Sequence, residues 1–188
     1  MRHIGLDFDD TLIPTRDAIL AFFNQRFGTA YKSQDFPTFR FSSIWGLTDE
    51  KFAELFHANL DYFHSMEPLP GMLETIAQWR NDSKFYIITG RPDCWVPPAA
   101  TWLKRHDIPY EEIINTSESM SDKGRLAQER GITLFIEDHA EAAMSLANVG
   151  IDVLLIDMPY NQQCVHPRIQ RVFNWDEIRS AAHSYGTQ

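Results

Sequence analysis

Acidic side chains crowd the segment that directly follows the first apolar stretch of this 188-residue chain. The segment LDFDDTL, residues 6–12, contains the three carboxylates of Asp7, Asp9 and Asp10. Carboxylates this close repel one another unless a cation lies among them, and their hard oxygen atoms suit magnesium. The carboxyl edge of a parallel sheet is also where α/β proteins bind ligands. Taken alone, the same pattern fits a solvated acidic turn.

A second group of polar residues closes the apolar run FYIIT, residues 85–89. The hydroxyl of Thr89 and the adjacent backbone amide can hold phosphate oxygens, and Gly90 lets the backbone approach a ligand closely. Arg91 follows, and it can contact a phosphate, contact the rest of a substrate, or form an ion pair. A simple turn is the alternative interpretation of this segment.

Two further signals are a lysine near the start of a predicted helix and a pair of acids at the end of a predicted strand. Lys123 would add a positive charge at a helix N-terminus, which itself favours anions. The acids are Glu137 and Asp138, which follow an apolar run. Alone, Lys123 also fits an exposed lysine and Asp138 a helix cap, so the combination carries the information.

These four motifs need elements that bring them together, and from residue 71 onward the pattern alternates between strand and helix. We predict strands over residues 4–8, 85–89, 112–115, 132–136, 151–156 and 171–173. We predict helices over residues 71–80, 95–105, 122–130, 139–148 and 176–183. Such alternation produces parallel strands joined by right-handed crossovers, and continuous apolar strands indicate a sheet covered on both faces. The predicted class is therefore α/β with a mostly parallel sheet.

Residues 14–69 do not follow this alternation. They contain two predicted helices, over residues 17–27 and 49–63, separated by a mixed segment rich in aromatic residues. We interpret them as a helical insertion after the first strand.

In this order, the four motifs resemble those of the haloacid dehalogenase-like phosphatase superfamily. The resemblance implies a Rossmann-like three-layer core built from residues 1–13 and 70–188. It implies that residues 14–69 form a small helical cap that closes over the site. It also implies a magnesium-dependent phosphatase.

By position, the resemblance assigns the reacting groups. Asp7 is expected as the nucleophile that is transiently phosphorylated, and Asp9 as the general acid and base. Mg²⁺ is the expected cofactor, held by Asp7, by the main-chain carbonyl of Asp9, and by Asp138.

The resemblance also assigns supporting roles. Thr89, Gly90 and Lys123 are expected to bind the phosphoryl oxygens, and Thr11 to brace the acidic loop. Glu137 is expected either to support the magnesium ligands or to coordinate through water. Because Glu stands where the superfamily often has Asp, the direct ligand stays open between these two acids.

Two short segments narrow the substrate. Residues 66–71 (MEPLPG) and 158–161 (MPYN) resemble parts of the 5′-nucleotidase, deoxy-type, cytosolic type C family and its bacterial nucleotidase-like relatives. The implied substrate is a nucleoside or deoxynucleoside monophosphate. Phe39, Phe41 and Trp45 are candidate pocket residues, because a flat aromatic ring can stack on a base, and Arg91 is a fourth.

Three alternatives accompany this interpretation. The chain could be a phosphatase for another small phosphorylated metabolite, or a catalytically silent phosphate-binding module. The silent module is disfavoured because a protein that only binds phosphate needs no acid or base at Asp9. Transfer of the phosphoryl group to an alcohol is a third option.

Composition limits the partners. The net charge is −9 with a pI of about 5.2 and no basic cluster, so we expect no nucleic-acid polymer as a partner. No apolar run approaches 18 residues, so we expect no membrane partner. The two cysteines, Cys94 and Cys164, lack metal-ligand spacing, and we expect a cytoplasmic protein.

Overall fold

Six parallel strands form the central sheet, in the order β3-β2-β1-β4-β5-β6. The computed structural model describes all residues except 39–40, 117–118, 183–184 and 186–188. The strands are β1 (Arg2–Leu6), β2 (Ser83–Thr89), β3 (Glu112–Asn115), β4 (Leu134–Glu137), β5 (Asp152–Ile156) and β6 (Ile169–Val172). The predicted α/β class and parallel sheet are confirmed.

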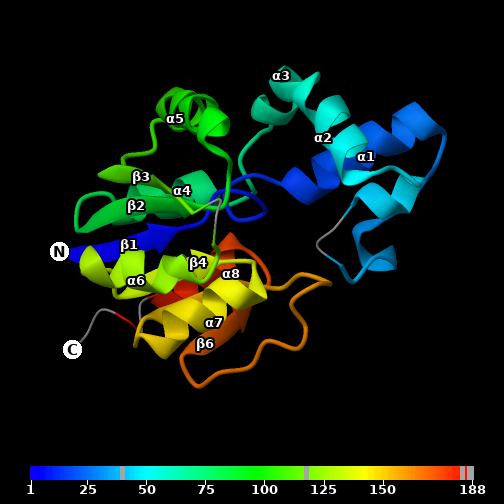
Figure 1. Ribbon diagram of the computed structural model, residues 1–188. Coiled ribbons are helices and arrows are strands. Elements are labelled where there is room, and N and C mark those ends of the chain that lie inside the picture. The colour runs from blue at the N-terminus through cyan, green and yellow to red at the C-terminus, as the bar shows by residue number, and fades with distance from the viewer. Residues whose placement is uncertain (39–40, 117–118, 183–184, 186–188) are drawn as a thin grey trace.

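Helices cover both faces of this sheet, which gives three layers (Figure 1). One face packs against α4 (Met72–Trp79), α5 (Val96–Arg105) and α8 (Trp175–Ala182). The other face packs against α6 (Asp122–Glu129) and α7 (Ala140–Asn148). Successive residues of one strand point to opposite faces of the sheet, so Ile87 faces the first group of helices and Ile88 the second. In the described residues, none of the helices combines the length and the apolar character needed to cross a bilayer.

A helical insertion, residues 14–69, separates β1 from α4 and lies beyond one end of the sheet (Figure 1). Its α-helices are α1 (Thr15–Phe27), α2 (Asp49–His57) and α3 (Leu60–His64), with short 3₁₀ turns at Ser33–Asp35 and Ser42–Trp45. Aromatic rings form its interior. Phe23 stacks on Trp45 with ring centroids 4.9 Å apart, and Phe56 stacks on Phe63 at 4.0 Å.

The predicted single helix over residues 49–63 is wrong, because the chain leaves helical geometry at Asn59. There φ is −129°, and the side-chain Nδ2 donates to the carbonyl of Leu55 at 2.8 Å. An asparagine that bonds its own backbone competes with the helical ladder, so two short helices form instead. The first strand also ends two residues earlier than predicted, at Leu6, so Asp7 begins the following loop.

The two connections between the insertion and the sheet are tied to each other. The amide of Leu69 donates to the carbonyl of Leu12 at 2.9 Å, which joins the returning chain to the outgoing one. Trp102 on α5 donates its Nε1–H to the carbonyl of Met66 at 2.7 Å. Proline stands in both connections, at Pro14 on the outgoing side and at Pro68 on the returning side. The insertion is therefore held to the core at the base.

Close packing of α6 on α7 depends on Gly124, the residue after Lys123. A Cβ at this position would lie 2.4 Å from the carbonyl oxygen of Ser145, which is backbone and cannot turn away. The amide of Gly124 also donates to Ser145 Oγ at 3.1 Å. The glycine thus sets how closely the helix that carries Lys123 approaches the core.

We predict that Gly124→Ala lowers the free energy of unfolding by about 1–3 kcal/mol, because the added methyl group forces α6 away from α7. Urea denaturation of purified protein measures the change. Gln128→Ala, on the exposed face of the same helix, is the matched control and should stay within about 0.5 kcal/mol of the parent. Equal stability of Gly124→Ala and the parent would contradict the packing argument.

Candidate active site

The loop after β1 turns sharply and presents its carboxylates at the carboxyl edge of the sheet. The amide of Asp7 donates to the carbonyl of Ile136 on β4 at 3.0 Å, which fixes the start of the loop. Asp10 adopts a left-handed conformation with φ of 54°, and Asp tolerates this region better than most residues do. The turn closes where the amide of Leu12 donates to the carbonyl of Phe8 at 2.9 Å.

The sequence resemblance predicts that Thr11 braces this loop. In the part of the chain that the structure describes, it is the main chain of Thr11, not its side chain, that makes a hydrogen bond. The carbonyl of Thr11 accepts from Trp175 Nε1 on α8 at 2.9 Å. Its hydroxyl is buried and has no hydrogen-bond partner among the described residues. The buried indole of Trp175 therefore anchors the loop to α8.

Lys123 lies fully buried between two carboxylates, one in the loop after β1 and one at the end of β4. Its Nζ is 2.5 Å from Asp7 Oδ1 and 2.8 Å from Glu137 Oε2. Burial by itself would lower the pKa of Lys123, but the charges of Asp7 and Glu137 raise it above its usual value. Lys123 therefore stays charged, and it fixes the orientation of Asp7.

Both carboxylate oxygens of Glu137 accept hydrogen bonds from the protein itself. Its Oε1 accepts from the backbone amides of Asp138 at 3.1 Å and His139 at 2.9 Å, while its Oε2 accepts from Lys123. Its side chain is completely buried. Glu137 and Asp138 both line the cavity, and these contacts favour Glu137 as the anchor of Lys123.

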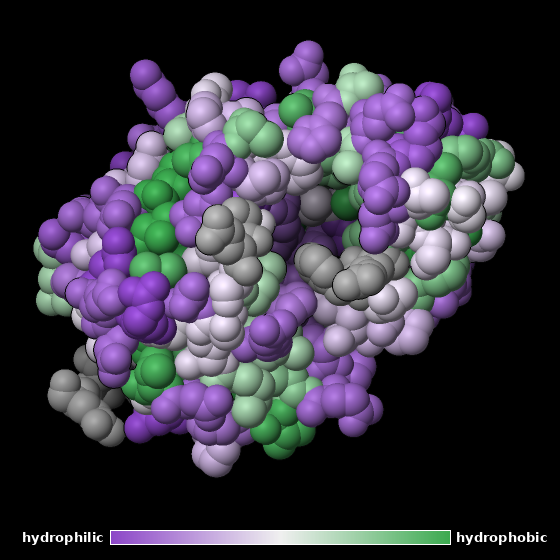
Figure 2. Space-filling model, viewed as in Figure 1, coloured by the Kyte–Doolittle hydropathy of each residue, from purple (hydrophilic) through white to green (hydrophobic). Residues whose placement is uncertain are grey.

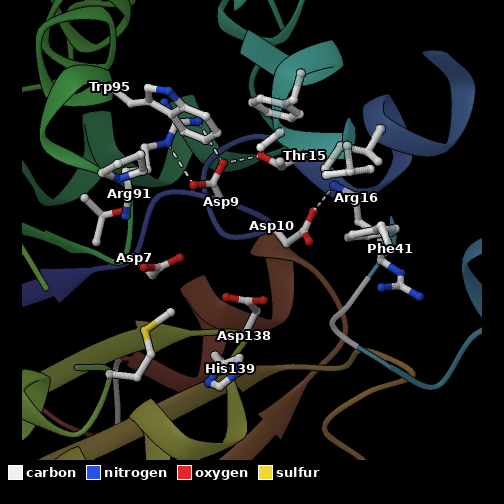
Figure 3. Close-up of a pocket in the computed structure, with 18 of the residues that line it drawn as sticks. Asp7, Asp9, Asp10, Thr15, Arg16, Phe41, Arg91, Trp95, Asp138 and His139 are labelled. Atoms are coloured by element: carbon white, nitrogen blue, oxygen red, sulfur yellow. Dashed lines mark hydrogen bonds and ion pairs between the residues drawn. The ribbon is translucent and has the colours of Figure 1, made fainter. Parts of the chain in front are cut away.

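Asp7 and Asp138 point into the same space (Figure 3). Oxygen atoms of Asp7, Glu137 and Asp138 lie within 4.8 Å of one another. Burial, and repulsion by neighbouring acids, raise the pKa of Asp7 to about 7 and that of Asp138 well above its usual value. A cluster of acids that ionises with difficulty is stabilised by a cation, so this arrangement suits a hard divalent ion.

Two residues after β5, to which the sequence motifs assign no role, hold Asp138. The hydroxyl of Tyr160 donates to Asp138 Oδ2 and lies 3.3 Å from Asp10 Oδ2. Asn161 donates its Nδ2–H to the main-chain carbonyl of Asp138 at 2.7 Å. The available signal was their position: the MPYN segment follows the strand β5, which pairs directly with β4.

Asp9 points to the other side of the cavity, where it pairs with Arg91 and Thr15 (Figure 3). Arg91 Nε lies 2.8 Å from Asp9 Oδ2 and Nη2 lies 2.7 Å from Oδ1, while Thr15 Oγ1 lies 2.5 Å from Oδ1. Burial alone would raise the pKa of Asp9, but the charge of Arg91 and these hydrogen bonds hold it below its usual value.

Thr89 and Gly90 lie at the end of β2 beside these acids and line the same cavity. Thr89 Oγ1 accepts from the amide of Arg91 at 3.2 Å, which leaves the hydroxyl hydrogen available to a ligand. Two of the three predicted phosphate-binding residues, Thr89 and Gly90, therefore line the same cavity as Asp7 and Asp9, whereas the buried Lys123 is not among the lining residues.

The cavity has a volume of about 590 Å³ and is bounded by the sheet edge and the insertion. The surface is hollowed between these two parts of the molecule (Figure 2). Phe41, Phe52 and Phe56 of the insertion and Trp95 of the core supply aromatic walls. The Trp95 ring stacks on Phe56 with centroids 4.6 Å apart.

The four predicted pocket residues have different positions. Phe41 and Arg91 line the cavity. Trp45 lies instead in the interior of the insertion, where it stacks on Phe23 and donates its Nε1–H to Thr29 Oγ1 at 3.1 Å, so its prediction as a lining residue is not met. Phe39 falls outside the described residues.

Arg16 is a lining residue that the sequence analysis did not single out. Its guanidinium donates to Ser33 Oγ and to the carbonyls of Ser33, Phe36 and Thr38, at 2.5–3.1 Å. Its backbone amide donates to Asp10 Oδ1 at 2.7 Å. Arg16 therefore links the acidic loop to the insertion segment 33–38.

Comparisons with known proteins agree with this geometry. Residues 1–183 match the family described as 5′ nucleotidase, deoxy (pyrimidine), cytosolic type C protein. A Clostridium acetobutylicum protein named as a nucleotidase is 26% identical over 181 residues, which cover 94% of this chain and 91% of that protein. The family resemblance of the sequence is thereby confirmed.

Solved structures show the same fold. A haloacid dehalogenase-like hydrolase from Streptococcus pneumoniae superimposes with a TM-score of 0.68 at 13% identity, covering 100% of this chain and 99% of that one. The Bacillus subtilis protein YfnB, whose crystal structure holds magnesium, gives a TM-score of 0.67 at 14% identity, covering 97% and 98%.

We predict that Asp10→Asn changes the pH dependence of stability. The pKa of Asp10 is raised from an ordinary value of 3.8 to about 7 in the folded protein, and burial is the largest cause of this shift. Its stabilising contribution is therefore complete below about pH 4 and is lost as the pH rises through about 7. Without divalent cations, the stability of Asp10→Asn relative to the parent should increase over this range.

Urea denaturation at intervals from pH 4 to pH 8 measures this difference. Asp17→Asn removes an exposed carboxylate nearby and is the matched control, which should keep the parent's trend. A constant difference between Asp10→Asn and the parent would show that Asp10 is not the responsible group.

Proposed function

This chain belongs to the 5′ nucleotidase, deoxy (pyrimidine), cytosolic type C family, and we propose that it hydrolyses nucleoside or deoxynucleoside monophosphates with magnesium bound at Asp7 and Asp138. Membership makes it a phosphatase of the nucleotidase type with a haloacid dehalogenase-like fold. The proposed substrate and magnesium site depend most on one observation. The buried Lys123–Asp7 pair lies beside Asp138, at the floor of a cavity with aromatic walls.

The donor set fits magnesium. Asp7 and Asp138 are buried acids whose pKa values are raised by burial, and the acidic cluster carries more negative charge than the single ammonium group of Lys123 compensates. Glu137 already accepts three hydrogen bonds, which supports Asp7, Asp138 and the main-chain carbonyl of Asp9 as the direct ligands. When bound, the ion would neutralise and orient the phosphate group of a substrate.

The first half-reaction transfers the phosphoryl group to Asp7. Lys123 holds Oδ1, which leaves Oδ2 to attack phosphorus as the bond to the leaving oxygen breaks. The negative charge of the bound phosphate would raise the pKa of Asp9 against the effect of Arg91, so that Asp9 can donate a proton to that leaving oxygen and the nucleoside departs as a neutral alcohol. The Thr89 hydroxyl, the Gly90 region of the backbone and the Lys123 charge stabilise the phosphoryl oxygens.

The second half-reaction releases phosphate. Asp9 accepts a proton from a water molecule, whose oxygen attacks phosphorus while the bond to Asp7 Oδ2 breaks. Inorganic phosphate leaves, and Asp7 returns to its ionised form paired with Lys123. The same carboxyl group thus gives a proton in one step and regains it in the next.

The cavity walls support a nucleotide as substrate. A base that enters between the aromatic side chains of the insertion and Trp95 could stack on one of them, a contact worth about 1–3 kcal/mol per base. In this proposal the helical insertion acts as the cap, because Phe41, Phe52 and Phe56 cover the cavity opposite the catalytic acids.

A screen of phosphate release tests the proposal. With magnesium, nucleoside monophosphates should be hydrolysed faster than sugar phosphates, and chelation should remove the activity until magnesium is returned. Asp7→Asn should lower turnover by at least about a thousandfold while nucleotide binding stays measurable by calorimetry, because the nucleophile is lost but the walls remain. Faster turnover of sugar phosphates would reject the nucleotidase, and an active Asp7→Asn protein would reject the nucleophile.

We also predict that Tyr160→Phe weakens magnesium binding by about 10–100-fold, because the hydroxyl that orients Asp138 is removed. Calorimetric titration of the substrate-free protein with magnesium measures the affinity. Tyr110→Phe, at an exposed site, is the matched control. Unchanged affinity with an unchanged melting temperature would show that Tyr160 does not support the ion site.

A further inference from the structure

One face of α2 in the insertion combines aromatic rings with a carboxylate. The residues of α2 that line the cavity are Asp49, Phe52, Ala53, Phe56 and His57, a spacing that places them on one side of the helix. Phe52 and Phe56 form the apolar part of this face, with ring centroids 6.3 Å apart. Asp49 lies one helical turn before Phe52, so a flat ring that packs on Phe52 has its edge near this carboxylate.

Ala53 leaves room beside the carboxylate. It lies four residues from both Asp49 and His57, in the same row of α2. Neighbours in such a row have Cβ atoms about 5–6 Å apart, and the alanine side chain ends at its methyl group, so the row has a gap there. Ala53 is exposed and lines the cavity, so the gap is accessible to a ligand. At the far end of the row, the His57 ring contacts Trp95 with centroids 5.5 Å apart.

Asp49 is oriented by the protein but keeps one oxygen for a ligand. Ser42 is buried and donates its hydroxyl hydrogen to Asp49 Oδ1 at 2.5 Å. Within the residues that the structure describes, Oδ2 accepts no hydrogen bond and Asp49 forms no ion pair. The amino end of α2, where Asp49 stands, also favours a negative charge. Asp49 is therefore a hydrogen-bond acceptor of fixed direction at the wall of the cavity.

The polar side chains that α1 contributes to the cavity are already engaged. Thr15 donates to Asp9, and the Arg16 guanidinium donates to a hydroxyl and to main-chain carbonyls of the segment 33–38. In the proposed reaction the phosphoryl group binds at the sheet edge, so the rest of the substrate faces the insertion. There Asp49 offers a carboxylate oxygen next to aromatic rings.

We propose that Asp49 contacts the edge of the substrate's base and selects a base with an exocyclic amino group, such as cytosine or adenine. This inference rests on the proposed nucleotidase function and names the class of nucleotide within it. An ionised carboxylate accepts hydrogen bonds and donates none, and a carboxylate that accepts from the amino group of cytosine is a recurrent contact in base recognition. Uracil and hypoxanthine carry a carbonyl oxygen in place of that amino group, and the carboxylate repels it.

Two pairs of nucleotides isolate this contact. An amino group in dCMP is replaced by a carbonyl oxygen in dUMP, and the same replacement relates AMP to IMP. The ratio of kcat/KM within a pair compares two bases in one enzyme preparation, so any loss of folded protein cancels. With magnesium present, the parent should favour the amino-bearing member of the pair that it hydrolyses faster by at least about tenfold, the effect of one hydrogen bond to a charged group at an accessible site.

Asp49→Asn removes the charge, keeps the size of the side chain and its acceptor for Ser42, and adds a donor. It should bring the ratio to about one or below, because an amide nitrogen can donate to the carbonyl oxygen of uracil or hypoxanthine. Asp49→Ala removes both the charge and the acceptor, and it should bring the ratio close to one without reversing it.

Glu50→Gln is the matched control. It removes a carboxylate from the same turn of α2, but Glu50 is exposed and is not among the lining residues of the cavity. The ratio should stay within about twofold of the parent's, because salt screens an exposed charge that makes no contact with the ligand. Thermal melting verifies that each variant is folded.

The results distinguish a failure of base selection from a failure of the nucleotidase function. A ratio near one in the parent, or an unchanged ratio in Asp49→Asn, would overturn selection by Asp49 and leave the nucleotidase intact. If both rates fall equally in Asp49→Asn, Asp49 contacts the sugar or only supports the fold. A shift in Glu50→Gln as large as that in Asp49→Asn would assign the effect to charge alone and overturn the contact. A parent that hydrolyses sugar phosphates but no nucleotide would overturn the proposed function, and base selection with it.

Discussion

A fully buried ammonium group between two carboxylates organises this molecule's site. Lys123 reaches from α6 to Asp7 on the loop after β1 and to Glu137 at the end of β4, so one side chain joins three elements far apart in the chain. Breaking a buried pair of this kind leaves an uncompensated charge, which typically costs about 3–5 kcal/mol. The position of the proposed nucleophile is therefore coupled to the packing of α6, and hence to the glycine that lets α6 approach α7.

The sheet order explains why the remaining groups meet. β2, β1, β4 and β5 are successive neighbours, and each ends at the same edge. Their loops contribute Thr89 and Arg91, the acidic loop, Asp138, and Tyr160 with Asn161. Two of the acids consequently receive a partner from the loop of an adjacent strand: Arg91 pairs with Asp9 and the Tyr160 hydroxyl bonds Asp138. Parallel topology thus places a charged or polar partner beside each of these two acids.

Much of this could be predicted because it depends on local patterns. Continuous apolar runs followed by polar residues mark buried strands and the loops at their ends, which is why the class of fold and the order of the motifs emerge from the letters alone. The acids stand at such ends and Lys123 in the first turn of a helix, and they do lie together.

What could not be predicted depends on rotamers and on packing between distant segments. Asn59 ends α2 through a side-chain bond that has no periodic signature. Trp45 and Phe41 have similar sequence surroundings, yet one packs inside the insertion and the other faces the cavity. The packing of distant segments against one another decides whether Arg91 contacts an acid or a ligand. It also decides whether Thr11 acts through its hydroxyl or its carbonyl.

The several bonds made by Arg16 have an energetic consequence for binding. One guanidinium satisfies acceptors on Ser33, Phe36 and Thr38, and lies between the rings of Phe41 and Tyr160, at 4.8 and 5.1 Å. The Arg16 side chain, which lines the cavity, is thereby held in place by the protein's own contacts before any ligand arrives. Ordering a loop on binding consumes part of the interaction energy, so a wall that is already rigid leaves more of that energy for affinity and discrimination between ligands.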